Sequence, residues 1–185
     1  MTWQLDLAHS NVTFSVKHMM VTTVRGSLKI ADGTLEFDPQ NPEASRVGVR
    51  IDAASIDTGA EQRDAHLRSP DFLDAQTHPY IEFRSTSVHR EGDDFKIHGE
   101  LTIHGVTRPV TLDAELGGVV ANLQGGQRAA FSARTRIDRE DFGLTWNVAL
   151  EQGGWLVGKQ IKVEIDLAAV SVEQVEASDA DEAVA

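Results

Sequence analysis

The sequence predicts an all-β fold, with eight or more antiparallel strands in a barrel or sandwich and a single helix. Apolar and polar residues alternate along most of the chain, which is the pattern of strands that are buried on one face. Turn signals recur at intervals of about 8–12 residues in much of the chain, a spacing typical of barrels and sandwiches. One segment replaces the alternation with the signals of a helix.

The predicted strands follow one another through most of the chain. The longest alternation begins at Phe95 and ends at Ile103. Asp32 and Gly33 stand between two shorter alternating runs, so we expect a β-hairpin turn at this pair. The alternating runs cover residues 12–16, 28–30, 35–37, 47–53, 81–83, 95–103, 110–116, 131–137 and 161–167.

The helix is predicted between two of these strands. Thr58 and Glu61 have the spacing of a capping box, in which each side chain bonds an amide of the other residue. Asp64 precedes Arg68 by four residues, an order of charges that stabilises a helix. A proline two residues later ends the pattern, because the residue before proline avoids the helical conformation. We therefore expect a helix over Gly59–Arg68, placed as a lid or flap on a barrel.

Composition excludes several classes of protein. The 185 residues suffice for one domain with its own core, and 41% of them are hydrophobic. The absence of cysteine excludes disulfides, thiolate metal sites and cysteine catalysis. A net charge of −12 argues against general nucleic-acid binding and against adsorption to anionic lipid surfaces.

The charge is uneven along the chain. The last thirteen residues, 173–185, carry five acidic residues and no basic one. We therefore predict a domain over residues 1–170 and an acidic, disordered tail over residues 171–185.

The sequence also leads to an expected location. No stretch approaches 18 apolar residues, and the first residues lack the basic and apolar regions of a signal peptide. We expect a cytoplasmic protein without a transmembrane segment, or a periplasmic one if a leader has been removed.

The predicted interior is compatible with a packed core or with a ligand cavity. A closed barrel of eight strands is just wide enough for its own side chains or for one slender ligand. Inward positions include small residues such as Gly99, Ala114 and Ala133, and only 6% of the chain is aromatic. Because a filled barrel would use larger side chains, this composition favours a cavity without excluding a packed core.

Motifs for metal binding and catalysis are absent from the sequence. The seven histidines form no HxH or HExxH pattern, and His98 and His104 are expected on one strand face about 20 Å apart. No GxSxG nucleophile motif and no glycine-rich phosphate loop occurs. Arg63 and His66 share a helix face, where they suit an anionic or hydroxyl head group, although ordinary surface ion pairs are the alternative.

Several motifs, in a fixed order and spacing, resemble the YceI-like family. The resemblance extends from Trp3 to about Leu167. The motifs include His9-Ser10, Lys17-His18, Ser55–Gly59, Arg63-Asp64, His66-Leu67, Asp71-Phe72, Gly99–Thr107, Asp138-Arg139 and Asp141–Gly143.

The resemblance implies an extended, lipocalin-like, eight-stranded antiparallel barrel with a short helix packed against it. It also implies a long apolar channel that holds a polyisoprenoid, an isoprenoid quinone or a fatty amide, and export to the periplasm in many members. We therefore predict a protein that sequesters or carries such an amphiphile, with no enzymatic activity, no metal and no cofactor other than the bound lipid. An enzyme acting on the lipid through His66 and Asp64, a stress-response interaction module with a packed barrel, and a homodimer formed at a strand edge stay open as alternatives.

Specific residues are expected to bind each part of the ligand. For the head group we predict contacts from side chains at the channel mouth, with Arg63 and Arg139 able to bind a phosphate through paired N–H groups. The predicted head-group residues are His18, Arg63, Asp64, His66 and Arg139. The predicted channel residues are Phe14, Val16, Val49, Ile51, Phe83, Leu101, Ile103, Phe131 and Trp146.

Overall fold

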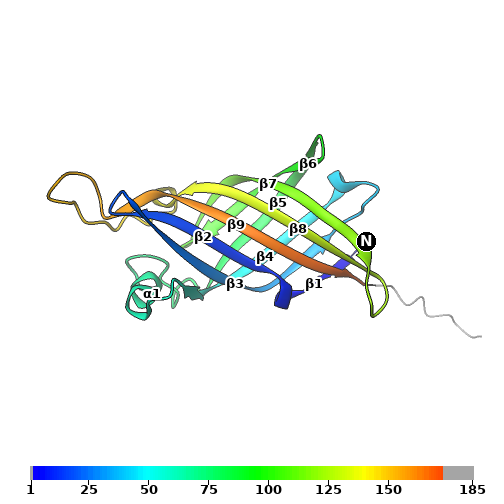
Figure 1. The fold of residues 1–185 in the computed structure, drawn as a ribbon, viewed down its shortest axis with the longest axis horizontal. Coiled ribbons are helices and arrows are strands. Elements are labelled where there is room, and N and C mark those ends of the chain that lie inside the picture. Colours follow the sequence, from blue (N-terminus) through cyan, green and yellow to red (C-terminus); the bar gives the residue numbers. More distant parts are fainter. Residues whose placement is uncertain (1, 173–185) are drawn as a thin grey trace, which may run out of the picture.

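The structure is a computed structural model that describes residues 2–172, in which nine strands form one antiparallel sheet (Figure 1). The strands are β1 (Thr2–Leu5), β2 (Asn11–His18), β3 (Thr22–Glu36), β4 (Arg46–Asp57), β5 (Tyr80–Glu91), β6 (Asp94–Ile103), β7 (Val106–Ala121), β8 (Gln127–Asp138) and β9 (Val157–Ser171). The helices are α1 (Glu61–Arg68) and the short 3₁₀ turns η1 (Leu7–His9), η2 (Pro42–Ala44) and η3 (Arg139–Phe142).

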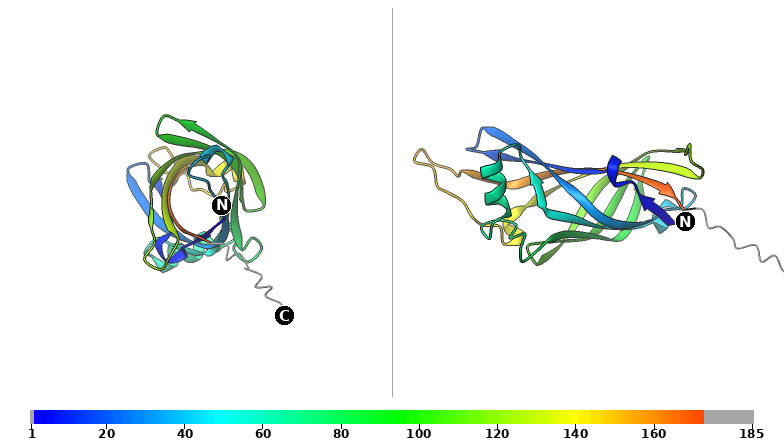
Figure 2. Two further views of the ribbon diagram at one scale, coloured as in Figure 1. Left: turned by 90° about the vertical axis from the view of Figure 1, so that its right-hand side faces the viewer. Right: turned by 90° about the horizontal axis from the view of Figure 1, so that it is seen from below.

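The sheet closes into a barrel of eight strands. Each strand from β2 to β9 pairs with its neighbours in the chain, and β2 also pairs with β9, where Val12 lies opposite Ile165. β1 fills the place where β3 and β9 separate beyond the start of β2, and pairs with both. The strands form a closed ring in the end-on view and an elongated barrel in the side view (Figure 2). The predicted all-β fold, a closed eight-stranded antiparallel barrel with one short helix, is confirmed.

The hairpin predicted at Asp32 and Gly33 is wrong. β3 continues through both residues, and only its register with β4 shifts between Ile30 and Asp32. A Cβ atom on Gly33 would lie 2.5 Å from the carbonyl oxygen of Gly48 and 2.8 Å from Leu5 Cδ1. Glycine therefore stands at position 33 because neighbouring atoms approach the backbone closely, and not because the chain turns there.

The helix exists, but its predicted capping and ion pair are wrong. α1 begins at Glu61 after Ala60, which has no side-chain capping bond. Thr58 instead donates its amide and hydroxyl to Asp64 Oδ1, at 2.9 and 2.5 Å. Arg68 pairs with Glu61 at 2.8 Å, because Asp64 faces inward and is only 4% exposed. In residues 2–172 no helix is both long and apolar enough to cross a membrane.

The predicted acidic tail lies almost entirely outside the described residues. Within them, β9 extends to Ser171, which lies opposite Trp3 of β1.

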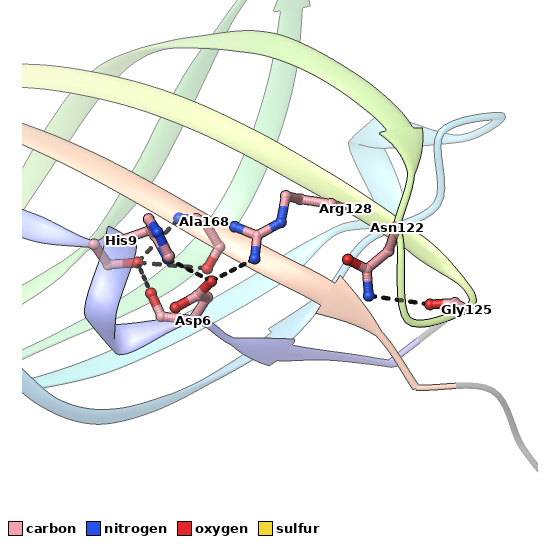
Figure 3. Close-up of polar contacts among 7 residues, drawn as sticks. Asp6, His9, Asn122, Gly125, Arg128 and Ala168 are labelled. Carbon is pink, nitrogen blue, oxygen red and sulfur yellow. Dashed lines mark hydrogen bonds and ion pairs between the residues drawn. The ribbon is translucent and has the colours of Figure 1, made fainter.

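A polar network fastens the first turn of the chain to the barrel (Figure 3). Asp6 Oδ2 accepts a hydrogen bond from Arg128 of β8, at 2.7 Å, and lies 2.8 Å from His9 Nδ1. Ser10 Oγ donates to the carbonyl of Asp6 and accepts from the amide of Ala168 in β9. The hydrogen bond from Arg128 holds the pKa of Asp6 below its ordinary value, although partial burial opposes the shift.

We expect Asp6→Asn to lower the free energy of unfolding at neutral pH and to have less effect in acid. A carboxyl whose pKa is lowered by folding stabilises the fold above its unfolded pKa of about 3.9, and this stabilisation disappears as the pH falls through the folded pKa. Urea unfolding of the wild type and the variant at neutral pH and at about pH 3 measures the difference. Asp93→Asn, in the exposed turn between β5 and β6, is the control. An equal effect of Asp6→Asn at both pH values would contradict this account.

Candidate functional site

The barrel encloses an apolar channel. It is lined by 39 residues, and only five of them, Ser45, Glu115, Ser132, Thr135 and Arg139, are polar or charged. Its volume is about 270 Å³. One water molecule has a share of about 30 Å³ in the liquid, so a space of this size is far more than a packing defect.

The channel follows the long axis of the barrel. Val157 and Leu167 both line it and lie ten residues apart on β9. At about 3.3 Å per residue this is about 33 Å along the strand, or about 25 Å along the axis for a strand tilt of about 40°. The space is therefore long and narrow.

Glycines keep two phenylalanine rings against the wall. A Cβ atom on Gly99 would lie 2.5 Å from the ring of Phe83, and one on Gly26 would lie 2.5 Å from the ring of Phe14. Each ring thus covers the bare backbone of a neighbouring strand. Because glycine has no side chain, each ring fits against the wall of the barrel and lines the channel there.

Aromatic side chains pack against one another at the end of the barrel near β1. Trp3 is 2% exposed and donates its indole N–H to the carbonyl of Phe37 at 2.8 Å. Phe37 in turn meets Phe131 edge to face, with ring centroids 5.0 Å apart. This end is packed and hydrogen-bonded, as interior aromatic groups usually are.

The opposite end, near α1, is built from loops. Leu67 of α1, Phe72, Leu73 and Leu144 line the channel there. Of these residues, Leu67, Leu73 and Leu144 were not predicted from the sequence, because they follow no strand alternation. The alternation does identify the lining residues of the strands, since one face of every strand points inward.

Eight of the nine predicted channel residues line the channel. Trp146 does not belong to the lining; it packs against His66 and Phe72, with ring centroids 4.6 and 5.4 Å away. The eight lining residues are Phe14, Val16, Val49, Ile51, Phe83, Leu101, Ile103 and Phe131. Their contact with a ligand stays a prediction.

The five predicted head-group residues come from three segments at the end near α1. Arg63, Asp64 and His66 belong to α1, and Arg139 belongs to η3. His18 ends β2 opposite Val157, whose carbonyl accepts a hydrogen bond from Arg139. His18 itself is half-buried and does not line the channel.

The polar groups of Arg63 and Asp64 bond Thr58, which lies just before α1. Arg63 donates its Nε–H to the hydroxyl of Thr58 and an Nη–H to the carbonyl of Thr58. The same hydroxyl donates to Asp64. These bonds hold the chain before α1, and Arg63 is exposed beside it.

His66 lies in an aromatic cluster at this end. Its Nε2 is 2.9 Å from Asp71 Oδ2, and its ring meets Phe72 and Trp146 edge to face. The imidazole is 38% exposed. The carboxylate partner of His66 is therefore Asp71, whereas Asp64 binds Thr58.

Arg139 is buried and bonded to the backbone. Its guanidinium donates to the carbonyls of Leu144, Trp146, Val157 and Gly158, at 2.5–3.3 Å. The residue is 2% exposed. Of its five N–H groups these bonds leave one, so paired hydrogen bonds to a phosphate would require some of them to break.

Known proteins are similar to this chain in sequence and in fold. A model of the YceI-like domain matches residues 3–169. The chain belongs to the YceI-like family. Protein YceI of Escherichia coli O17:K52:H18 is 45% identical over 136 residues, which are 74% of this chain and 71% of that protein.

Solved structures of other proteins share the fold of this chain. The Campylobacter jejuni YceI protein is 31% identical with a TM-score of 0.72, over 85% of this chain and 90% of that chain. Burkholderia cenocepacia BcnA is 25% identical with a TM-score of 0.76, over 90% and 99% of the two chains. A polyisoprenoid binding domain from Saccharophagus degradans shares the fold at 15% identity, with a TM-score of 0.63 over 92% and 98%.

Proposed function

We propose that this YceI-like protein binds the long apolar tail of an amphiphile in its channel and sequesters or carries that molecule. The observation that carries the proposal is a long channel in which only five of 39 lining residues are polar. Such a surface offers little directional chemistry, but it removes an apolar chain from water. Each buried methylene contributes about 0.8 kcal/mol, so a long tail binds tightly without specific contacts.

The expected ligand classes are polyisoprenoids, isoprenoid quinones and fatty amides. All combine a long apolar chain with one compact polar end, which matches a narrow channel about 25 Å long. The polyisoprenoid binding named for the Saccharophagus degradans domain supports the same class for this barrel.

We infer that the tail enters from the end near α1 and that the head group stays there. At the other end Trp3, Phe37 and Phe131 pack against one another. Near α1, His66 presents a partly exposed imidazole beside Trp146. An imidazole next to an aromatic ring suits a hydroxyl, a carbonyl or a quinone ring better than it suits a charge alone.

The geometry gives less support to the alternatives. An enzyme led by His66 and Asp64 would need these groups to cooperate, yet Asp64 accepts from Thr58 and His66 lies beside Asp71. A barrel filled by its own side chains would leave no space of about 270 Å³.

Solvent extraction of the purified protein, followed by mass spectrometry, tests the proposal. We expect the extract to contain a long-chain isoprenoid or fatty compound, and we expect stripped protein to take up ubiquinone or a polyprenol at one molecule per chain. An empty extract together with no uptake of either probe would overturn it. Conversion of a bound prenyl ester or fatty amide to product, lost on changing His66, would establish the enzyme instead.

A further inference from the structure

Two loops outside the channel bring together two imidazoles and a carboxylate. Asp74 and His78 belong to the loop between α1 and β5, and His104 lies in the turn between β6 and β7. Their ligand atoms, one from each residue, all lie within 4.8 Å of one another. The side chains are half-buried, and the two imidazole centroids are 5.1 Å apart.

The sequence-based prediction placed His104 differently. It was expected on the same strand face as His98, but β6 ends at Ile103 and His104 begins a two-residue turn before Val106. This turn rotates the imidazole of His104 away from the face expected for a strand residue. The spacing of the histidines in the sequence could not reveal the cluster, because 26 residues separate His78 from His104.

The backbone fixes the position of each group. His104 and Gly105 have φ angles of 53° and 73°, the left-handed conformation that a tight two-residue hairpin turn requires at both positions. Asp74 is also left-handed, with φ of 46°, and its carbonyl accepts from the amides of Thr77 and His78. The ring of His78 lies over Gly105, where a Cβ atom would be 2.8 Å from its Cε1.

The side chains of Asp74, His78 and His104 have no role in the features described above. His9 and His66 lie beside carboxylates, and His98 lies beside the hydroxyl of Thr111. In residues 2–172, by contrast, neither imidazole of the cluster has a side-chain hydrogen bond or ion-pair partner, and neither does Asp74. Three groups that could each bond a cation therefore converge without bonding one another.

We propose that Asp74, His78 and His104 form a site for a divalent transition-metal ion of the Zn²⁺ type. Two imidazoles and one carboxylate are ligands that Zn²⁺ accepts, with a fourth position left for water. Zn–N and Zn–O bonds of about 2.0–2.2 Å place tetrahedral ligands about 3.3 Å apart, so small side-chain rotations suffice to close the cluster.

The site would join two loops at the end of the channel near α1. Leu73 precedes Asp74 and Ile103 precedes His104, and both of these apolar residues line the channel. A bound ion would therefore cross-link the segment after α1 to the β6–β7 turn, directly outside the wall. The proposal concerns binding of the ion and does not depend on which lipid occupies the channel.

Isothermal titration of the chelator-treated full chain with Zn²⁺ alone tests the site. We expect one ion per chain, and we expect His104→Asn and Asp74→Asn each to weaken binding by at least about tenfold, because even indirect partners of a metal contribute 10–100-fold. Asparagine suits the left-handed backbone at both positions, and Asn-Gly is a preferred pair in this turn, so both variants should keep their fold. Circular dichroism and thermal unfolding without metal verify this.

The second close histidine pair provides the control. His89 and His98 have ring centroids 5.4 Å apart on neighbouring strands but do not belong to the cluster with Asp74. The double variant His89→Asn, His98→Asn should bind Zn²⁺ as the wild type does. No saturable binding to the wild type, unchanged affinity in His104→Asn, or an equal loss in the control variant would each overturn the proposal.

Discussion

Ala133→Trp is expected to lower the affinity for a long-chain quinone or polyprenol by about 100-fold while leaving the barrel folded. Ala133 lines the channel in the middle of β8, opposite Ala114 of β7, which also lines it, and opposite Ile165 of β9. An indole at this place would project across the narrow space. If it keeps about four methylene groups of the tail out of the channel, the binding free energy falls by about 3 kcal/mol.

The stability of the same variant separates an open channel from a packed core. In a packed core the added ring would force side chains from their rotamers, which costs about 1–3 kcal/mol or more. In an open channel the ring occupies free space against apolar walls, so the unliganded protein should lose less than about 1 kcal/mol. Titration with the lipid and urea unfolding of the stripped protein measure the two effects.

Arg134→Trp is the matched control. Arg134 follows Ala133 on β8 and points outward, with a side chain that is 63% exposed and a 4.0 Å ion pair to Glu115. An exposed pair of this kind contributes little to stability. This variant should bind lipid as the wild type does. Equal affinity of Ala133→Trp and Arg134→Trp would mean that the tail does not pass the middle of the barrel.

The strands could be predicted because alternation reports directly which face of a strand is buried. Phe83, Leu101 and Phe131 were all assigned to the interior from this pattern, and all line the channel. The pattern also explains the error at Asp32 and Gly33. The alternation changes phase within β3, because Leu28 and Ile30 are buried before the pair and Leu35 after it, and the register with β4 shifts between Ile30 and Asp32. An irregularity inside a continuous strand therefore produced the same break in the pattern as a turn would.

The loops could not be predicted in the same way, because their contacts follow no regular period in the sequence. Thr58 and Glu61 fit a capping box locally, but Asp64 takes both donors of Thr58 and thereby enters the interior. Trp146 looked like a channel residue because it is large and apolar, yet it packs against His66 and Phe72. Thr58 thus bonds a residue six positions away, and Trp146 contacts residues far from it in the sequence; both contacts prevailed over the local pattern.

Arg139 was predicted to bind a head group, but its hydrogen bonds to backbone carbonyls indicate a structural role. It lies in η3, directly after β8, and connects this turn to the irregular segment before β9 through the carbonyls of Leu144, Trp146, Val157 and Gly158. Burial lowers its pKa, but arginine starts so far above neutrality that the group stays protonated. No other side chain offers donors in three directions from one plane.

We therefore expect Arg139→Met to destabilise the fold by about 3–5 kcal/mol, because it leaves several buried carbonyls without a donor. This is a large part of the total stability of about 5–15 kcal/mol that a domain of ordinary size has. The segment 143–156 should become sensitive to proteases before the barrel unfolds, since its link to η3 is lost. Urea unfolding and limited proteolysis measure the two effects.

Two further variants distinguish the hydrogen bonds from the charge. Arg139→Lys keeps the charge and can donate to some of the carbonyls, but not along the Nε, Nη1 and Nη2 directions together, so we expect an intermediate loss of stability. Arg136→Met, an exposed position on β8, should change stability by no more than about 0.5 kcal/mol. If Arg139→Met unfolds within about 1 kcal/mol of the wild type, water replaces the guanidinium at these carbonyls. In that case Arg139 would be free to leave the backbone and bind a phosphate, and the head-group role predicted from the sequence would regain its support.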